Sequence, residues 1–133
     1  MMFSRNFFRF AACCALASAL TTFGVHLLPL LHPANTFQEQ LLLSQNPIYK
    51  LRLWLVLIHI LFVLTSMWGI AAAKYKTAAG WVGLGLGGYW IFGLAELFRV
   101  SFALNAITPW RARLLNEPNP EVREVLKENL LSW

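Results

Sequence analysis

The residues best suited to chemistry are four ionisable side chains that interrupt long apolar stretches of the sequence: His26, His59, Glu96 and Arg99. Ionisable groups in an apolar environment are costly unless they are paired or hydrated, so they mark candidate functional sites. Counting inward from the ends of the apolar stretches, at about 1.5 Å per helical residue, places His26, His59 and Glu96 at a similar depth. If the stretches pack together, we expect these three side chains to form one cluster, with Arg99 beside them.

Helical phase supports this cluster, because at about 100° per residue each stretch has one small or polar face. The faces are Ala12, Ala15, Ala19, Thr22 and His26 in the first stretch, Arg52, His59 and Ser66 in the second, and Gly85, Gly88, Phe92, Glu96 and Arg99 in the third. The cluster predicts a ligand or proton-handling site, and imidazoles also suit axial ligation of haem or chlorophyll. The alternative is structural: Glu96 and Arg99 neutralise each other, and the histidines are hydrogen-bonded packing residues.

Membrane helices are the elements expected to position these residues. Apolar residues make up 58% of the 133 positions and charged residues 13%, which is about half the charged share of a soluble domain. We expect an all-α integral membrane protein with three transmembrane helices at about residues 7–31, 51–73 and 78–104, because about 20 apolar residues span a bilayer. The transmembrane domain then covers residues 1–104, and residues 105–133 form an amphipathic helical tail at the interface or on a partner.

The first stretch also has features of a cleaved signal peptide. Arg5 and Arg9 precede it, and residues 17–19 read Ala-Ser-Ala, a small-residue cleavage pattern. The apolar run continues to Leu31, however, which is long enough to span a bilayer. The sequence therefore favours an uncleaved helix.

Local capping signals predict where helices begin. Thr36 and Glu39 have capping-box spacing ahead of three leucines, which indicates a short interfacial helix within the first loop. Asn46, Thr108 and Asn119 each precede a proline, and a capping residue before proline is typical of a helix start. These signals predict the start of the second transmembrane helix and of two short helices in the tail.

Two surfaces suit helix packing. Ala79, Gly83 and Gly87 repeat every four residues, a small-residue pattern that lets another helix backbone approach closely, either within the chain or from another subunit. In the tail, apolar side chains recur at the helical period. They are Val122, Val125, Leu126, Leu130 and Trp133. We expect this apolar stripe to be buried, either in the membrane interface or against a partner protein.

Basic residues suggest the orientation of the three expected helices. Arg5 and Arg9 at the N-terminus and the Lys74–Lys76 turn fall on one side of the membrane, whereas Glu39 and the tail fall on the other. The basic count of the two sides is balanced, so the first helix decides in favour of an N-terminus inside. We expect a multi-pass protein of a bacterial inner membrane or another cellular membrane.

The sequence carries no motif that names an enzyme: there is no HExxH, no serine elbow and no pair of carboxylates. We expect no catalytic residue and no metal, and the sequence requires no cofactor. It predicts a small accessory or scaffolding subunit of a larger membrane protein complex, whose partners are the lipid bilayer and other membrane subunits or copies of itself. Two alternatives stay open, a membrane protein that binds haem, chlorophyll or quinone at the His/His/Glu cluster, and a small proton-coupled carrier. Nucleic acid is not an expected partner, because the basic residues form no single stripe.

Overall fold

The computed structural model describes residues 3–31 and 33–131, and this part of the chain is helical and contains no strand. The elements in order are α1 (Arg5–Leu27), η1 (Leu28–Leu31), α2 (Phe37–Leu42), η2 (Leu43–Gln45), α3 (Pro47–Phe102), η3 (Ala103–Ile107), α4 (Thr108–Asn116) and α5 (Pro120–Leu131). The all-α prediction is confirmed. Two helical segments, Arg5–Leu31 and Pro47–Asn116, are long and apolar enough to cross a membrane.

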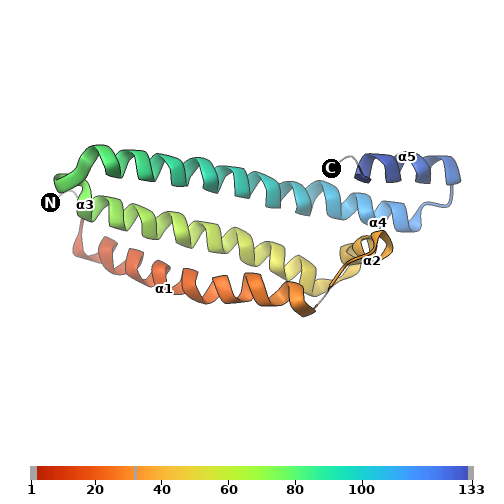
Figure 1. Cartoon of the computed structure of the whole chain (residues 1–133). Helices are drawn as coiled ribbons and strands as arrows, with labels where there is room; N and C mark the ends of the chain where they lie inside the picture. The colour runs from red at the N-terminus through yellow and green to blue at the C-terminus, as the bar shows by residue number, and fades with distance from the viewer. Residues whose placement is uncertain (1–2, 32, 132–133) are drawn as a thin grey trace.

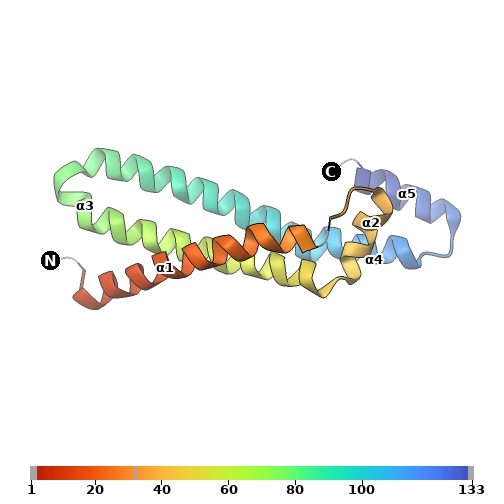
Figure 2. The same cartoon turned by 60° about the horizontal axis from the view of Figure 1, so that its bottom comes forward.

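α3 is two antiparallel arms joined at Ala78. The backbone of Ala78 leaves the helical region, with φ −152° and ψ 48°, and the chain reverses there. The first arm is residues 47–77 and the second arm is residues 79–102. Together with α1 they form an elongated bundle of three rods, with the start of α1 and the reversal at one end and α2, α4 and α5 at the other (Figures 1 and 2).

α1 runs antiparallel to the first arm and approaches it closely at two glycines. A Cβ on Gly69 would stand 2.5 Å from the Cβ of Ala11, and a Cβ on Gly24 would stand 2.6 Å from a methyl carbon of Leu55. Cys14 is buried on the same side of α1 as Ala11. Only glycine leaves room for such contacts, so these positions set the register between the two helices.

The inward face of α1 differs from the face that helical phase indicated. Ala12, Ala15 and Ala19, which belong to the small or polar face that helical phase indicated, are all exposed. The contact face lies about one residue earlier and is centred on Ala11 and Cys14. The physical reason is that α1 is apolar on most sides, and the fit against Gly69 decides which of its small residues is covered.

The core lies between the two arms of α3. Leu53, Val56, Ile60 and Leu64 recur every three or four residues on the first arm and form one buried cluster with Val100 of the second arm. Such spacing places side chains on one face of a helix. The arms can approach because Gly93, opposite Leu64, has no side chain: a Cβ there would lie 3.0 Å from a Leu64 methyl carbon.

The capping signals of the first loop are present as the sequence predicts. The Glu39 backbone N–H donates to the Thr36 hydroxyl at 3.3 Å, and the Thr36 backbone N–H donates to the Glu39 carboxylate at 3.0 Å, which completes the capping box of α2. Asn46 caps α3 by accepting from the backbone N–H of Ile48 at 2.9 Å. α2 packs against α4 and buries Leu41. These local contacts close the end of the bundle opposite the reversal.

The second arm continues into the tail without a break, because η3 is a wide π-helical turn that leads directly into α4. α4 begins at Thr108, as the sequence predicts, but Thr108 is itself helical and makes no N-cap, so the prediction that it caps this helix is wrong. Its hydroxyl instead donates to the carbonyl of Ala103 at 2.7 Å. Pro109 has no N–H to donate, and its ring clashes with the preceding turn of a regular α-helix. A wide π turn accommodates both effects. The boundary expected at residue 104 lies inside this continuous helix.

α5 turns back alongside α4 (Figure 1). Asn119 caps it by accepting from the Glu121 backbone N–H at 3.0 Å. Of the apolar stripe on α5, Val122, Leu126 and Leu130 are half-buried, whereas Val125 is exposed. Trp133 lies outside the described residues. Part of the stripe therefore faces the chain's own α2 and α4, since Leu130 lines a cavity with residues of both regions.

Candidate functional site

A polar contact between α1 and α3 joins Thr21 and His59. The Thr21 hydroxyl oxygen lies 2.8 Å from Nδ1 of His59, and the two residues are 38 positions apart in the chain. α1 presents Thr21 one turn before Val25, and the first arm presents His59 beside the buried Ile60. The antiparallel register set by the close contacts at Gly69 and Gly24 brings the two side chains together.

Hydrogen-bond accounting indicates the tautomer of His59. The Thr21 hydroxyl has one proton, and its oxygen lies 2.9 Å from the Ala17 carbonyl and 3.0 Å from the Ser18 carbonyl, both acceptors. If the proton goes to a carbonyl, Nδ1 of His59 must donate to Thr21, and Nε2 of the neutral ring keeps its lone pair. Nε2 is then free to accept a hydrogen bond or to bind a ligand.

His59 borders a groove that all three rods line, with a cavity volume of about 350 Å³. α1 contributes Ser18 and Thr22, and the second arm contributes Tyr89 and Phe92. The hydroxyl of Ser66, also in the lining, donates to the carbonyl of Phe62 at 2.8 Å, so it is already satisfied. The lining is mainly apolar with a few polar groups, which is the usual character of a small-molecule site.

Glu96 and Arg99 pair with each other. Arg99 donates to one carboxylate oxygen of Glu96 at 2.7 Å from Nη2 and at 3.0 Å from Nε. Both residues belong to the second arm, and the Arg99 side chain is 63% exposed whereas that of Glu96 is 27% exposed. The structure therefore shows the mutual neutralisation that the spacing of these two residues indicated.

Three of the four predicted site residues, His59, Glu96 and Arg99, take part in these two contacts, whereas His26 takes part in neither. No hydrogen bond among the described residues joins His26 or Glu96 to His59, and His26 is exposed. His26 lies one turn beyond Thr22, and Glu96 one turn beyond Phe92, both on the side of the groove nearer α4. Neither residue is among those that line the groove.

Sequence reasoning missed Thr21 and Tyr89. Both side chains look like ordinary residues of an apolar helix, and their roles depend on the rotation of each helix about its axis. One feature of the sequence did indicate the face of the first arm that lines the groove. Ser66 stands seven residues after His59 and shares its face, and Ser66 lines the groove. Arg52 stands seven residues before His59 on the same face of the first arm, two helical turns away from it.

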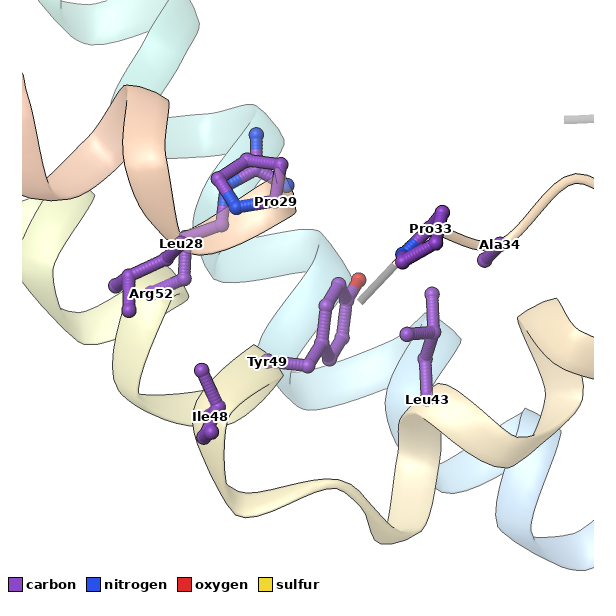
Figure 3. Close-up of a pocket in the computed structure, with 8 residues that line it drawn as sticks. All are labelled: Leu28, Pro29, Pro33, Ala34, Leu43, Ile48, Tyr49 and Arg52. Atoms are coloured by element: carbon purple, nitrogen blue, oxygen red, sulfur yellow. The ribbon is translucent and has the colours of Figure 1, made fainter. Parts of the chain in front are cut away.

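Arg52 lies in a second cavity of about 230 Å³, where η1, the start of α3 and η2 meet. Figure 3 shows Arg52 and Tyr49 among the side chains that line this cavity. The Nε of Arg52 is buried and has no hydrogen-bond partner among the described residues. Tyr49 is occupied differently, because its hydroxyl accepts from Arg111 at 3.3 Å. This contact ties α4 to the start of α3.

The small-residue pattern on the second arm is open. Among the described residues, nothing outside the local helical backbone lies within 4 Å of the position that a Cβ would occupy at Gly83 or Gly87, and Ala79 is exposed. The glycine that does pack inside the chain is Gly93, against Leu64. Of the two uses expected for the pattern, packing within the chain finds no support among the described residues.

No group of three histidine, cysteine, aspartate or glutamate side chains in the described ranges is arranged to hold a metal ion. No known protein family matches this chain, and no curated protein or solved structure is significantly similar to it. The proposals that follow therefore depend on the geometry of the chain itself.

Proposed function

We propose that this chain is a three-span membrane protein that serves as a small accessory or scaffolding subunit of a larger membrane complex. α1 and the two arms of α3 are the three spans. Their outward faces carry large apolar side chains, among them Leu20, Phe23, Trp81 and Ile91, which are exposed on the surface of the chain. Soluble proteins rarely expose apolar patches of this extent, whereas a bilayer covers them without cost.

The observation that carries the scaffolding role is the open glycine face of Gly83 and Gly87. A glycine inside a helix lowers its stability by roughly 0.5–1 kcal/mol relative to alanine. Contact with lipid alone does not offset this loss. Small residues at four-residue spacing are useful when another helix backbone packs on them. No helix of the described chain packs on these two glycines, although Gly83 also borders the cavity lined by Phe8 and Trp68. This supports a helix of another subunit or of a second copy as the occupant of the face at Gly87.

The matched variants for testing this face lie on the same arm. Gly83→Leu and Gly87→Leu place a large side chain on the proposed interface, whereas Gly88→Leu points roughly 120° away from its centre around the helix. A Cβ at Gly88 meets nothing within 4 Å outside its own helical backbone. We expect the first two variants to lose partner recovery or self-association in mild detergent, at unchanged melting temperature. Gly88→Leu should retain both. Equal recovery in all three variants would remove the glycine face from the proposal.

The three-span topology has its own test. Cysteine is introduced at Ser4, Glu39, Lys76 or Glu128 in a chain whose native cysteines are replaced by serine. We expect a membrane-impermeant reagent to label Ser4→Cys and Lys76→Cys from one side, and Glu39→Cys and Glu128→Cys from the other. Labelling of all four positions from one side would contradict three spans.

A second candidate function is the binding of a small ligand or cofactor in the groove beside His59. The observation in its favour is the Thr21–His59 contact, which orients an imidazole that lines the groove. A haem- or chlorin-type ligand would give an absorption band that His59→Ala abolishes and Thr21→Val shifts. A quinone would be found by extraction of the purified protein. A featureless spectrum with no extracted quinone would leave only the scaffolding role.

A proton-coupled carrier receives less support. Such a carrier requires an acid within the membrane that gains and loses a proton during transport. Glu96 is the acid expected at membrane depth, and its carboxylate is held by Arg99 at 2.7 Å. This ion pair suits a structural role.

A further inference from the structure

Net charge is distributed unequally between the two ends of the bundle. The end with the start of α1 and the reversal carries Arg5, Arg9, Lys74 and Lys76 (Figure 1). Four of the eleven basic residues and none of the six acidic residues belong to this end, so it holds four of the chain's five net positive charges. The rest of the chain balances nearly all of its basic residues with glutamates. This end therefore has a strongly positive field with no internal counter-charge.

The start of α1 strengthens that field. The unpaired N–H groups at a helix N-terminus act as about half a positive charge, which acidic residues in the first turn ordinarily offset. α1 has no acidic residue in its first turn, and Arg5 is its first residue. The Ser4 hydroxyl accepts from the Phe7 backbone N–H at 3.2 Å, which satisfies one group and adds no charge. An external anion at this end is electrostatically favoured.

A cavity of about 610 Å³ opens beside these charges. Phe8 lines it from α1, Trp68 and Tyr75 from the first arm, and Leu86 from the second arm. The ammonium group of Lys76 is the one charge among the described residues that line it. Its volume lies within the range of about 300–1,000 Å³ that is usual for ligand sites, and its walls are suited to hydrocarbon.

We propose that this cavity holds an acyl chain of an anionic phospholipid whose headgroup phosphate pairs with the surrounding basic residues. The inference rests on the three-span insertion proposed above, which places Tyr75 and Lys76 at headgroup level, where aromatic and basic side chains collect. Phosphate oxygens accept charge-assisted hydrogen bonds from lysine and arginine. A zwitterionic headgroup finds no acidic residue here for its cationic part, so the site selects a lipid with net negative charge.

The test compares two lipids on the full chain. Phosphatidylglycerol and phosphatidylcholine with identical acyl chains are offered at equal concentration to the protein in detergent, and bound lipid is measured by native mass spectrometry. We expect the unaltered chain to retain phosphatidylglycerol preferentially. Lys74→Gln with Lys76→Gln should lower the ratio of the two bound lipids roughly fivefold or more, because each cation near an anionic surface contributes a several-fold gain. Arg123→Gln with Lys127→Gln removes the same charge from α5 and should leave the ratio unchanged.

The apolar half of the site is tested by Ala72→Phe, which places a ring in the cavity that Ala72 lines. We expect this variant to bind less phosphatidylglycerol at unchanged melting temperature, and inorganic phosphate at the same concentration should not displace the lipid. Equal ratios in the two charge variants, or undiminished lipid in Ala72→Phe, would overturn the proposal. The cysteine-labelling pattern distinguishes failure of the lipid site from failure of the three-span topology. A chain that inserts with three spans but shows no lipid preference refutes the lipid site alone.

Discussion

The tightest contact between α1 and the first arm gives the most direct test of the packing. In Gly69→Ala the new Cβ would stand 2.5 Å from the Cβ of Ala11, whereas ordinary carbon contacts begin at 3.4 Å. α1 must therefore move away by roughly 1 Å. Overpacking of this kind costs about 1–3 kcal/mol, and the better helix propensity of alanine returns up to about 1 kcal/mol. With the full propensity gain, we expect a net loss of up to about 2 kcal/mol in the free energy of unfolding.

The assay uses Cys14, which is 4% exposed beside this contact. In a Cys13→Ser background, a thiol-reactive fluorophore reports the unfolding temperature in detergent as Cys14 becomes accessible. Gly69→Ala should lower the midpoint by several degrees. The control is Gly88→Ala, where a Cβ meets no atom within 4 Å, and its midpoint should be unchanged or higher.

A compensating substitution identifies the cause. Ala11→Gly removes the methyl group that the new Cβ meets, so the two substitutions together should destabilise the chain less than the sum of their separate effects. The expected coupling is about 1–3 kcal/mol, equal to the relieved overpacking. Strict additivity of the two substitutions would refute the close approach of α1 to the first arm at these residues.

Two other outcomes follow from the charged contacts. Hydrogen bonds from the backbone N–H groups of Thr36 and then Asn35 lower the pKa of Glu39 below its ordinary 4.5. The Glu39 carboxylate therefore contributes fully to the stability of α2 above about pH 4.5, and this contribution is lost as the pH falls through the lowered pKa. Hydrogen exchange of α2, corrected for intrinsic rates, should show protection lost at acid pH in the native chain and a smaller, pH-independent protection in Glu39→Gln; identical pH profiles would contradict this. Glu96→Leu leaves the Arg99 guanidinium unpaired, so in detergent it should melt below Glu96→Gln, and adding Arg99→Leu should recover stability. A double variant no more stable than Glu96→Leu would show that the ion pair is not what Glu96 contributes.

Local signals were the reliable part of the sequence. Thr36 and Glu39 form the expected capping box, and Asn46 and Asn119 cap the expected helices. Such caps depend on groups within three or four residues of each other, which a sequence displays directly. Thr108 failed as a cap because helical conformation on both sides of it, continued through a π turn, outweighed the local preference.

The sequence by itself determined that the chain is helical and too apolar for an ordinary soluble domain, since these properties depend on composition and on the period of apolar residues. Only the tertiary structure decided which side of each helix is used. It put Ala11 of α1 against the first arm, paired His59 with Thr21, and left Gly83 open while Gly93 was covered. The physical reason is that a helix apolar on nearly all sides has no preferred inward face. Its rotation is settled by contacts between residues far apart in the chain, such as the 38 positions between Thr21 and His59.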